Sequence, residues 1–334
     1  MLNSAFSVNM EYKRKLQLRQ LWQACFHDSD DYLDIFFNNV YDPSFAHDVC
    51  RDGEVVSALY MLPYLLRLDA GCVLPMQYMC GVSTAEAYRG QGLASDLIRQ
   101  VLQKETAPLV CLMPAEDSLF DYYSQFGFSP AFFREEVPVE SVTLSDASGE
   151  KMSRDEMADF CQREECSRNF SLQHGRNDFE VVIKEHLSSG GLIFSKKGKY
   201  CGFAVDTEKG ILLKDWFGEF PRPLPVAGLG EKKVFRRQRG HVPYGMVRIV
   251  DAFEVLIAFA GIYPQVDRIE LTVVDDVIEK NNFSVRIVDG KCKKIQKNPT
   301  AKVLSVAELA DYLFVKQSKV RGLCGGMWMS LMLE

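Results

Sequence analysis

The sequence predicts an α/β (α+β) fold whose central sheet mixes parallel and antiparallel strands. Three observations support this class. Amphipathic helical patterns come first, at residues 12–26 and in a segment that begins after Ser29, a residue type favoured as a helix N-cap. Apolar segments at 46–51, 55–68 and 72–83, separated by Asp-Gly and Ala-Gly turns, then predict an antiparallel meander. A glycine-rich turn finally leads into another amphipathic helix.

The glycine-rich turn contains Gly90 and Gly92 and stands between a strand-like run and a helical pattern. The apolar residues after it recur at helical spacing: Leu93, Leu97, Ile98, Val101 and Leu102. Free backbone N–H groups at a helix N-terminus attract anions, and glycines let a phosphate approach the main chain. We therefore interpret the turn as a cradle for a pyrophosphate. A tight strand-to-helix turn without any ligand is the alternative.

The residues of this turn carry a known pattern. Arg89-Gly90-Gln91-Gly92-Leu93-Ala94 reads Arg-x-x-Gly-x-Ala and resembles the acetyl-CoA fingerprint of the GNAT acetyltransferases. The sequence contains neither a Gly-x-x-x-x-Gly-Lys-Ser/Thr loop nor a Gly-x-Gly-x-x-Gly motif. Their absence argues against a nucleotidase with a phosphate-binding loop and against a dinucleotide-binding fold. The resemblance implies these cofactor-binding residues: Val82, Thr84, Arg89, Gly90, Gln91, Gly92, Leu93 and Ala94.

A second signature follows at the expected place. The apolar run at 108–113 predicts a buried parallel strand beside the strand that precedes the turn. A helical pattern then begins at Asp117, an N-cap candidate, and ends at Gly127. Tyr123, Gly127 and Phe128 spell Tyr-x-x-x-Gly-Phe, which resembles the second GNAT signature. The resemblance covers residues 8–136.

The chain is long enough for three domains. Residues 1–140 are expected to form the GNAT acetyltransferase domain. The pattern in 141–225 repeats the outline of the first domain without the cofactor motif, which predicts a degenerate GNAT-like domain. A break rich in proline and glycine precedes 226–334, where strands followed by a closing helix predict an α+β domain. Helices are expected at 154–163, 178–187 and 253–259, strands at 191–195, 200–205, 211–215, 246–250, 268–274 and 283–288, a cap at Asp251, and a capping box at Ser305 and Glu308.

The spelling of residues 82–89 and the long region behind them look most like the Eis-type branch of the GNAT family. The string at 246–251 resembles the sterol-carrier-type C-terminal domain of that branch. In the family, main-chain N–H groups at the positions of Val82 and Thr84 bind the pantetheine arm and the thioester oxygen. Such donors would act as an oxyanion-type set during acyl transfer.

The resemblance assigns the general acid to Tyr123. A phenol with an ordinary pKa of about 10 is protonated at neutral pH and can supply a proton to a departing thiolate. The alternative is that Tyr123 is a core aromatic residue. Tyr122 points about 100° away around the helix and is the weaker candidate.

The general base is assigned less directly. In Eis-type enzymes the C-terminal carboxylate enters the active site, which implies the same role for Glu334. The apolar tail at 325–333 predicts that this end is packed, so a tail buried for packing alone is an equal alternative. Acidic residues near the second helix can line an entrance for a cationic amine or simply begin a solvated helix: Asp28, Asp30, Asp31 and Asp34.

These residues together predict an N-acetyltransferase that moves an acetyl group from acetyl-CoA to a primary amine by direct attack in a ternary complex. The acceptor is a small molecule or a peptide or lysine amine, and a homo-oligomer is left open. The alternative is a non-catalytic protein that binds CoA, or a hydrophobic ligand in the C-terminal region, on a GNAT scaffold. An intact Tyr123 favours the enzyme, because a binding protein has no need of it.

Composition narrows the remaining classes. The chain has 334 residues, of which 47% are hydrophobic and 25% charged, and a formal net charge of −6, which disfavours nucleic-acid binding. Its ten cysteines form no Cys-x-x-Cys pair, and its five histidines show no metal-ligand spacing, so no metal is expected. Early charged residues and the absence of an 18-residue apolar run disfavour a signal peptide and a membrane span. We therefore expect a cytoplasmic protein.

Overall fold

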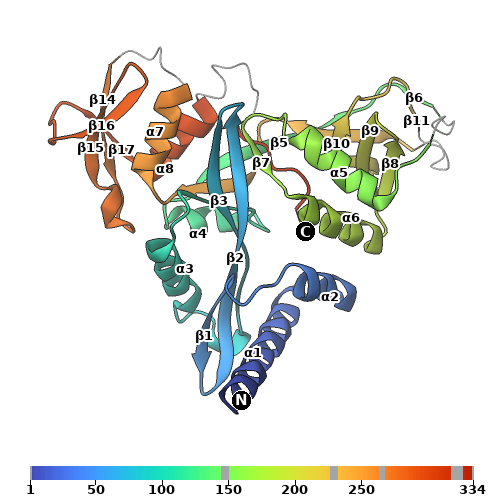
Figure 1. Cartoon of the computed structure of the whole chain (residues 1–334), viewed down its shortest axis with the longest axis horizontal. Helices are drawn as coiled ribbons and strands as arrows, with labels where there is room; N and C mark the ends of the chain where they lie inside the picture. The colour runs from blue at the N-terminus through green and yellow to red at the C-terminus, as the bar shows by residue number, and fades with distance from the viewer. Residues whose placement is uncertain (1, 144–149, 226–231, 263–267, 317–325, 333–334) are drawn as a thin grey trace. The chain divides into compact units, whose positions relative to one another are not determined.

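The structure, a computed structural model, describes residues 2–143, 150–225, 232–262, 268–316 and 326–332 (Figure 1). The chain forms two compact units, and each combines segments that are distant in sequence. The first unit contains Met1–Tyr64, Leu74–Pro130 and Gly245–Leu313. The second unit contains Leu65–Val73, Ala131–Tyr244 and Phe314–Glu334.

The first unit begins with α1 (Leu2–Phe26) and α2 (Asp30–Asn39). Both helices are predicted by the sequence, but α1 starts at Leu2 rather than at residue 12. The Ser29 hydroxyl accepts a hydrogen bond from the backbone N–H of Tyr32 at 3.2 Å, which confirms the predicted cap of α2. Aromatic side chains join these helices to the sheet. The Trp22 ring lies 4.5 Å from that of Phe36 and 5.1 Å from that of Tyr60 between centroids.

The sheet of the first unit is mixed, which confirms the predicted class. Its strands are hydrogen-bonded in the order β1 (Ala46–Arg51), β2 (Glu54–Asp69), β3 (Cys72–Thr84), β4 (Leu109–Leu112) and β13 (Val242–Ile249). Strand β4 runs parallel to β3, as expected, and antiparallel to β13. The strand expected at 246–250 therefore exists, but nothing in the sequence pattern indicates its pairing with β4.

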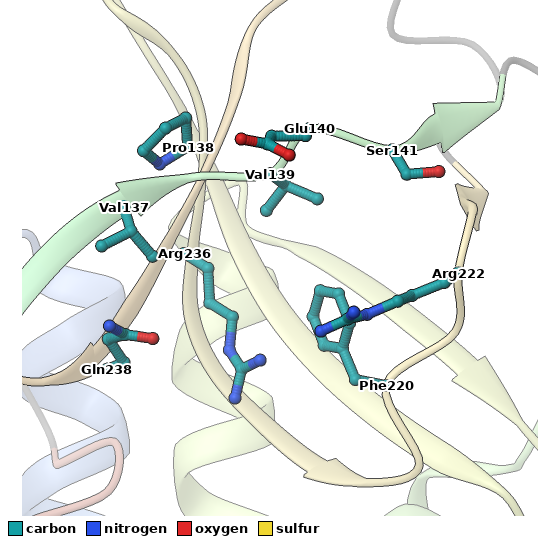
Figure 2. A pocket seen from close by; sticks show the side chains of 9 residues that line it. All are labelled: Val137, Pro138, Val139, Glu140, Ser141, Phe220, Arg222, Arg236 and Gln238. Atoms are coloured by element: carbon teal, nitrogen blue, oxygen red, sulfur yellow. The ribbon is translucent and has the colours of Figure 1, made fainter.

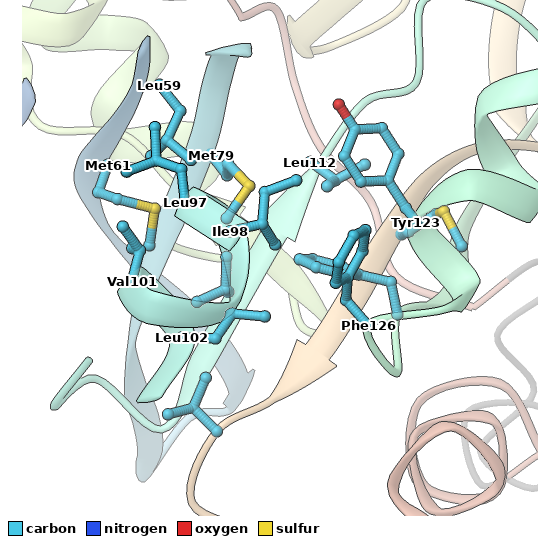
Figure 3. Packing of buried hydrophobic residues seen from close by; sticks show 14 of the residues in the cluster. Leu59, Met61, Met79, Leu97, Ile98, Val101, Leu102, Leu112, Tyr123 and Phe126 are labelled. Carbon is cyan, nitrogen blue, oxygen red and sulfur yellow. The ribbon is translucent and has the colours of Figure 1, made fainter. Parts of the chain in front are cut away.

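Helices α3 (Leu93–Lys104) and α4 (Ser118–Ser124) pack on the apolar side of this sheet (Figure 3). The predicted apolar face of α3 is confirmed, because Leu97, Ile98, Val101 and Leu102 are all buried. Burying a leucine or isoleucine of this kind contributes about 1.5–3 kcal/mol. Asp117 is the N-cap residue of α4, as predicted, but its backbone is already helical, with φ −59° and ψ −35°, and its side chain makes no capping hydrogen bond.

A smaller sheet completes the first unit. Its strands are ordered β16 (Lys291–Ile295), β15 (Phe283–Val288), β14 (Ile269–Val274) and β17 (Lys302–Ser305), and α7 (Ala252–Ile262) and α8 (Val306–Ala310) contact it (Figure 1). The predicted capping box between Ser305 and Glu308 is present. The Asp251 carboxylate accepts from the backbone N–H of Glu254 at 3.0 Å, which confirms the cap of α7. The sequence patterns missed β16 and β17.

A buried ion pair joins β13 to the segment after β14. The Arg248 Nη2 atom lies 2.7 Å from each carboxylate oxygen of Asp275, and both side chains are almost fully buried. The same carboxylate accepts hydrogen bonds from the backbone N–H groups of Val277 and Ile278 and from the Asn281 side-chain amide. The pair therefore has the additional hydrogen bonds that a buried charge requires.

The second unit contains a run of strands covered by two helices. Its strands are ordered β5 (Ser129–Pro138), β12 (Val234–Arg239), β10 (Gly210–Gly218), β9 (Tyr200–Thr207) and β8 (Leu192–Lys196). Strand β7 (Ser171–Gln173) pairs with the end of β2 at Leu65–Arg67. Strands β6 (Val142–Thr143) and β11 (Leu224–Pro225) form a separate two-stranded sheet. Helices α5 (Arg154–Glu165) and α6 (Arg176–Ser188) supply apolar side chains to its core. The helices and strands predicted between 154 and 215 are all present, with their ends shifted by a few residues.

The apolar tail packs into the second unit, as predicted, over the described residues 326–332. The backbone N–H of Trp328 donates to the carbonyl of Phe170 at 2.8 Å, and Trp328 accepts from Leu172 at 2.9 Å. The Tyr244 hydroxyl donates to the Met329 carbonyl at 3.0 Å and accepts from the Met329 N–H at 2.9 Å. Glu334 lies outside the described residues.

Replacing Asp275 with alanine should destabilise the protein by about 3–5 kcal/mol, because Arg248 would remain buried without a counter-charge. The matched control is Lys280→Ala, which breaks a 3.2 Å ion pair with Asp251 between partly exposed side chains and should cost less than about 1 kcal/mol. Urea unfolding followed by circular dichroism measures both losses. Equal losses for the two variants would contradict a structural role for the buried pair.

Candidate active site at the start of α3

The turn between β3 and α3 has the backbone that the sequence predicts. Gly90 and Gly92 have φ of +74° and +80°, a left-handed conformation that other residues rarely adopt, and Gly92 is the N-cap of α3. A Cβ atom built on either glycine would meet no protein atom within 4 Å among the described residues. The main chain of the turn is therefore open to a ligand.

The first turn of α3 has no side-chain cap. Its N-cap residue, Gly92, has no side chain, and the N–H groups that open an α-helix lack intrahelical partners. Leu93 and Ala94 are half-buried in this first turn, next to the exposed Gly92. Asp96 also lies there, with its carboxylate 3.9 Å from Arg99. An uncapped N-terminus beside two open glycines has the geometry of an anion site.

The side chains of the turn point back toward the body of the loop. The Arg89 Nε atom donates to the Thr84 carbonyl at 3.1 Å, and its Nη2 atom lies 4.0 Å from the Cys25 Sγ atom. The Gln91 amide donates to the Ala87 carbonyl at 3.4 Å. These contacts hold the exposed loop in shape and leave the glycine main chain uncovered.

Strands β3 and β4 pair only over part of their length. Their parallel register joins Met76, Gln77 and Tyr78 to Leu109, Val110 and Cys111. Strand β3 continues beyond this ladder to Thr84, where it enters the turn. Among the described residues, the edge of β3 that faces β4 therefore has no ladder partner just before the turn.

The predicted main-chain donors lie on this unpaired edge. The N–H of Ala85 donates to the Val56 carbonyl of β2 at 2.9 Å. Main-chain groups alternate sides along a strand, so those of Val82 and Thr84 point away from β2. The Thr84 carbonyl accepts from Arg89, which agrees with this direction. The structure thus brings the edge of β3 and the glycine turn together along one continuous stretch of main chain.

Tyr123 lies on α4 and is 8% exposed. Its ring centroid is 5.2 Å from that of Tyr122 and 5.9 Å from that of Phe128, and its hydroxyl lies at the end of the ring away from Phe126 (Figure 3). No hydrogen bond to that hydroxyl is found among the described residues. Burial, reinforced by Tyr122 and Cys80, raises the pKa of the Tyr123 phenol, so it stays protonated at neutral pH.

In the part of the chain that the structure describes, Tyr122, unlike Tyr123, has a hydrogen-bond partner for its hydroxyl group. Its hydroxyl is 3.1 Å from the Ser95 hydroxyl, in the first turn of α3. This hydrogen bond ties α4 to the start of α3 and therefore to the glycine turn. Sequence reasoning missed Ser95, because a serine near a helix start gives no signal of a partner 27 residues away.

Most of the acidic residues near α2 already have partners. Asp28 accepts from the Trp22 indole N–H at 2.8 Å. Asp30 and Asp34 pair with Arg19 at 3.2 and 2.7 Å. The interpretation as a helix start is therefore favoured over an entrance for a cationic amine.

Among the described residues, no group of three or more histidine, cysteine, aspartate or glutamate side chains is placed to hold a metal ion. No helix within the described ranges is long and apolar enough to cross a membrane.

Comparison with protein families finds a match over part of the chain. Residues 10–131 match the family model described as acetyltransferase (GNAT) domain. The matched segment contains both signatures found in the sequence, together with the open turn, the edge of β3 and Tyr123. A comparison with curated proteins finds no match.

Solved structures of similar fold span almost the whole chain. A probable N-acyltransferase from Enterococcus faecalis V583 has a TM-score of 0.73 and 14% identity over 96% of this chain and 97% of its own. A GCN5-related N-acetyltransferase from Anabaena variabilis ATCC 29413 has a TM-score of 0.71 and 18% identity, covering 95% and 97%. Eis1 from Mycobacterium abscessus has a TM-score of 0.68 and 13% identity, covering 95% and 92%. At these identities the likeness shows a shared fold, which confirms the predicted fold class.

Proposed function

We propose that this protein is an N-acetyltransferase that transfers the acetyl group of acetyl-CoA to a primary amine. One observation carries the proposal. The Arg-x-x-Gly-x-Ala sequence forms an open, uncapped helix start inside a segment that matches the acetyltransferase (GNAT) domain. Such a helix start binds phosphate groups through its N–H groups and its dipole.

Cofactor binding would use main chain more than side chains. The N–H groups of residues 90–94 would hold the diphosphate of acetyl-CoA, with Arg89, Gln91 and Leu93 shaping the turn. The N–H groups of Val82 and Thr84 would meet the pantetheine arm and the thioester oxygen. Their direction away from β2 supports this assignment.

The chemistry proposed is direct transfer in a ternary complex. A neutral amine nitrogen attacks the thioester carbon, the new C–N bond forms, and the C–S bond breaks. The departing thiolate takes the proton of the Tyr123 hydroxyl, and the amine gives up one proton to a base. A phenol that is protonated and has no hydrogen-bond partner among the described residues suits this donor role.

The base is proposed to be a carboxylate at Glu334. This assignment rests on the resemblance to the Eis-type branch and on the buried tail that precedes it at Gly326–Met332. An ammonium group with an ordinary pKa of about 10.4 must lose a proton before it can attack, so a nearby carboxylate would assist catalysis.

A second candidate is a non-catalytic protein that holds CoA or a hydrophobic ligand on the same scaffold. The burial of Tyr123 favours this alternative, because a core aromatic residue is buried in the same way. A thiol-release assay with acetyl-CoA and a panel of primary amines separates the two. Release with at least one amine supports the enzyme, whereas CoA binding without release for any amine supports the binder.

The wider organisation is proposed on the same basis. Residues 226–334 are proposed as a sterol-carrier-like region, supported by the small sheet of β14–β17 with α7 and α8. The division into domains at 1–140, 141–225 and 226–334 remains a prediction. The two compact units of the structure follow a different division, because each combines parts of more than one of these ranges. A cytoplasmic location, an acceptor that is a small-molecule or peptide amine, and a possible homo-oligomer also remain predictions.

Replacing Gly92 with aspartate should weaken acetyl-CoA binding by at least about 100-fold, or about 2.7 kcal/mol, because a carboxylate would stand where a diphosphate must bind. The matched control is Gly53→Asp in the turn between β1 and β2. Gly53 has the same φ of +80° and an equally open Cβ position, so backbone strain is the same. Calorimetry should find near wild-type affinity for the control, and equal weakening of both variants would contradict the cradle.

Replacing Tyr123 with phenylalanine should lower kcat for thiol release by about 10²- to 10⁴-fold while acetyl-CoA affinity stays unchanged. The ring and its packing are kept, and only the hydroxyl is lost. Tyr122→Phe serves as the control, because it breaks the hydrogen bond to Ser95 and should cost kcat far less. A wild-type kcat for Tyr123→Phe would remove Tyr123 from the mechanism.

Deleting Leu333 and Glu334 should abolish turnover and leave acetyl-CoA binding measurable by calorimetry. Glu334→Gln removes only the side-chain carboxylate, so comparing it with the deletion shows whether that side chain is the group required. Turnover that is unchanged after the deletion would show that this end of the chain supplies no base.

A further inference from the structure

The second unit contains a cavity of about 260 Å³ that has no place in the proposed reaction (Figure 2). It lies where the end of β5 passes beside β12 and the segment between β10 and β11. The residues that define its chemistry are Val139, Glu140, Phe220, Arg222, Arg236 and Gln238. All of them lie outside residues 10–131, the segment that matches the acetyltransferase domain.

Arg236 occupies an unusual position for a charged residue. It lies on β12, an interior strand, opposite Val137 of β5 and Leu213 of β10. Side chains two residues apart share a face of a strand, so Arg236 shares the face of Val234. Val234 is buried in an apolar cluster that includes Leu213 and Trp216. The Arg236 guanidinium therefore stands at the edge of an apolar core.

Neither cavity arginine has an acidic partner. Among the described residues, no ion pair or hydrogen bond is made by the guanidinium of Arg222 or Arg236, and the buried Arg236 Nε atom is unsatisfied. Asp215 is near enough to act on Arg236, but it already pairs with Arg168 at 3.3 Å and accepts from the Trp216 N–H at 2.7 Å.

The charges around Arg236 are only partly compensated. Burial lowers the pKa of Arg236, the positive charges of Arg168 and Arg222 act in the same direction, and the negative charge of Asp215 offsets them in part. Figure 2 shows the Glu140 carboxylate directed away from both cavity guanidinium groups. A half-buried cation at the edge of an apolar core, with the exposed Arg222 nearby, is stabilised when an anion joins them.

The cavity is also shaped to hold its arginines in place. The Arg236 guanidinium lies 4.5 Å from the centre of the Phe220 ring, an arrangement that fixes the plane of its donors. In Figure 2 the Arg222 side chain enters the cavity from the segment between β10 and β11. A planar guanidinium with fixed donors suits bidentate recognition of a carboxylate or a phosphate.

We propose that this cavity binds a small organic anion, whose carboxylate or phosphate group is held between Arg222 and Arg236 and whose apolar body packs against Phe220 and Val139. The anion supplies the counter-charge that the protein lacks there. The cavity is slightly smaller than the usual range for ligand sites, about 300–1,000 Å³, and therefore fits a small metabolite rather than a nucleotide.

The test is calorimetry on the full chain at constant ionic strength, with phenyl phosphate and benzoate as probes. Inorganic phosphate and acetate, which lack the apolar body, are included for comparison. At least one of two results is expected. Phenyl phosphate should bind saturably and more tightly than inorganic phosphate, or benzoate should bind saturably and more tightly than acetate. Preference between phenyl phosphate and benzoate distinguishes a phosphate ligand from a carboxylate ligand.

Arg222→Gln and Arg236→Gln should each weaken this binding at least about tenfold, because each removes a charge-assisted contact. The matched control is Arg237→Gln on the same strand, which faces the other way and pairs with Glu136 at 3.4 Å. It should bind within about twofold of wild type. Arg222 is exposed, so its variant tests the site even where Arg236→Gln fails to fold.

The absence of saturable binding by every probe would overturn the proposal. So would equal weakening in Arg237→Gln, which would indicate attraction to general positive charge. Acetyl-CoA affinity should be unchanged in Arg222→Gln. The proposal of an anion site and the proposal of a transferase site are therefore tested independently.

Discussion

The structure of the candidate site depends on one constraint, an α-helix that begins without a side-chain cap. Two left-handed glycines bring the chain from β3 into α3 and leave the main chain uncovered at the turn. The helix is held in place by its opposite side, where Leu97, Ile98 and Val101 are buried. Stability thus comes from the apolar face, and the polar end is free to bind an anion.

The same constraint determines how far β3 extends and where α4 lies. Strand β3 must reach the turn, so it extends past its ladder with β4 and presents an unpaired edge. Helix α4 places Tyr123 in the same core and is tied to the start of α3 through Tyr122 and Ser95. An open helix start, strand N–H groups without a ladder partner among the described residues and a protonated phenol therefore belong to one folded unit. This combination fits acyl transfer from a thioester better than it fits passive binding, which needs no proton donor.

Local features of this fold could be predicted from the sequence, and long-range pairings could not. Periodicity and capping residues located β1 to β4, α3 and the capping box at Ser305, because these signals lie within a few residues of each other. The pairing of β13 with β4 joins segments more than 130 residues apart, as Met246 opposite Leu112 shows, and no local pattern encodes it. Asp117 had the right residue type for a cap, but its own backbone became helical. The arginine-lined cavity was missed because the basic residues at 232–239 give no local signal that Arg236 lies on an interior strand, β12.

Amide chemical shifts measured by NMR test the central claim most directly, because they report on each N–H group separately. We expect added CoA to shift the amides of residues 90–94 together with those of Val82 and Thr84. Pantetheine, which lacks the diphosphate, should shift Val82 and Thr84 and leave 90–94 unchanged, and inorganic pyrophosphate should do the reverse. CoA that binds without moving the amides of 90–94, or that moves a different helix start, would contradict the assignment of this turn as the diphosphate site.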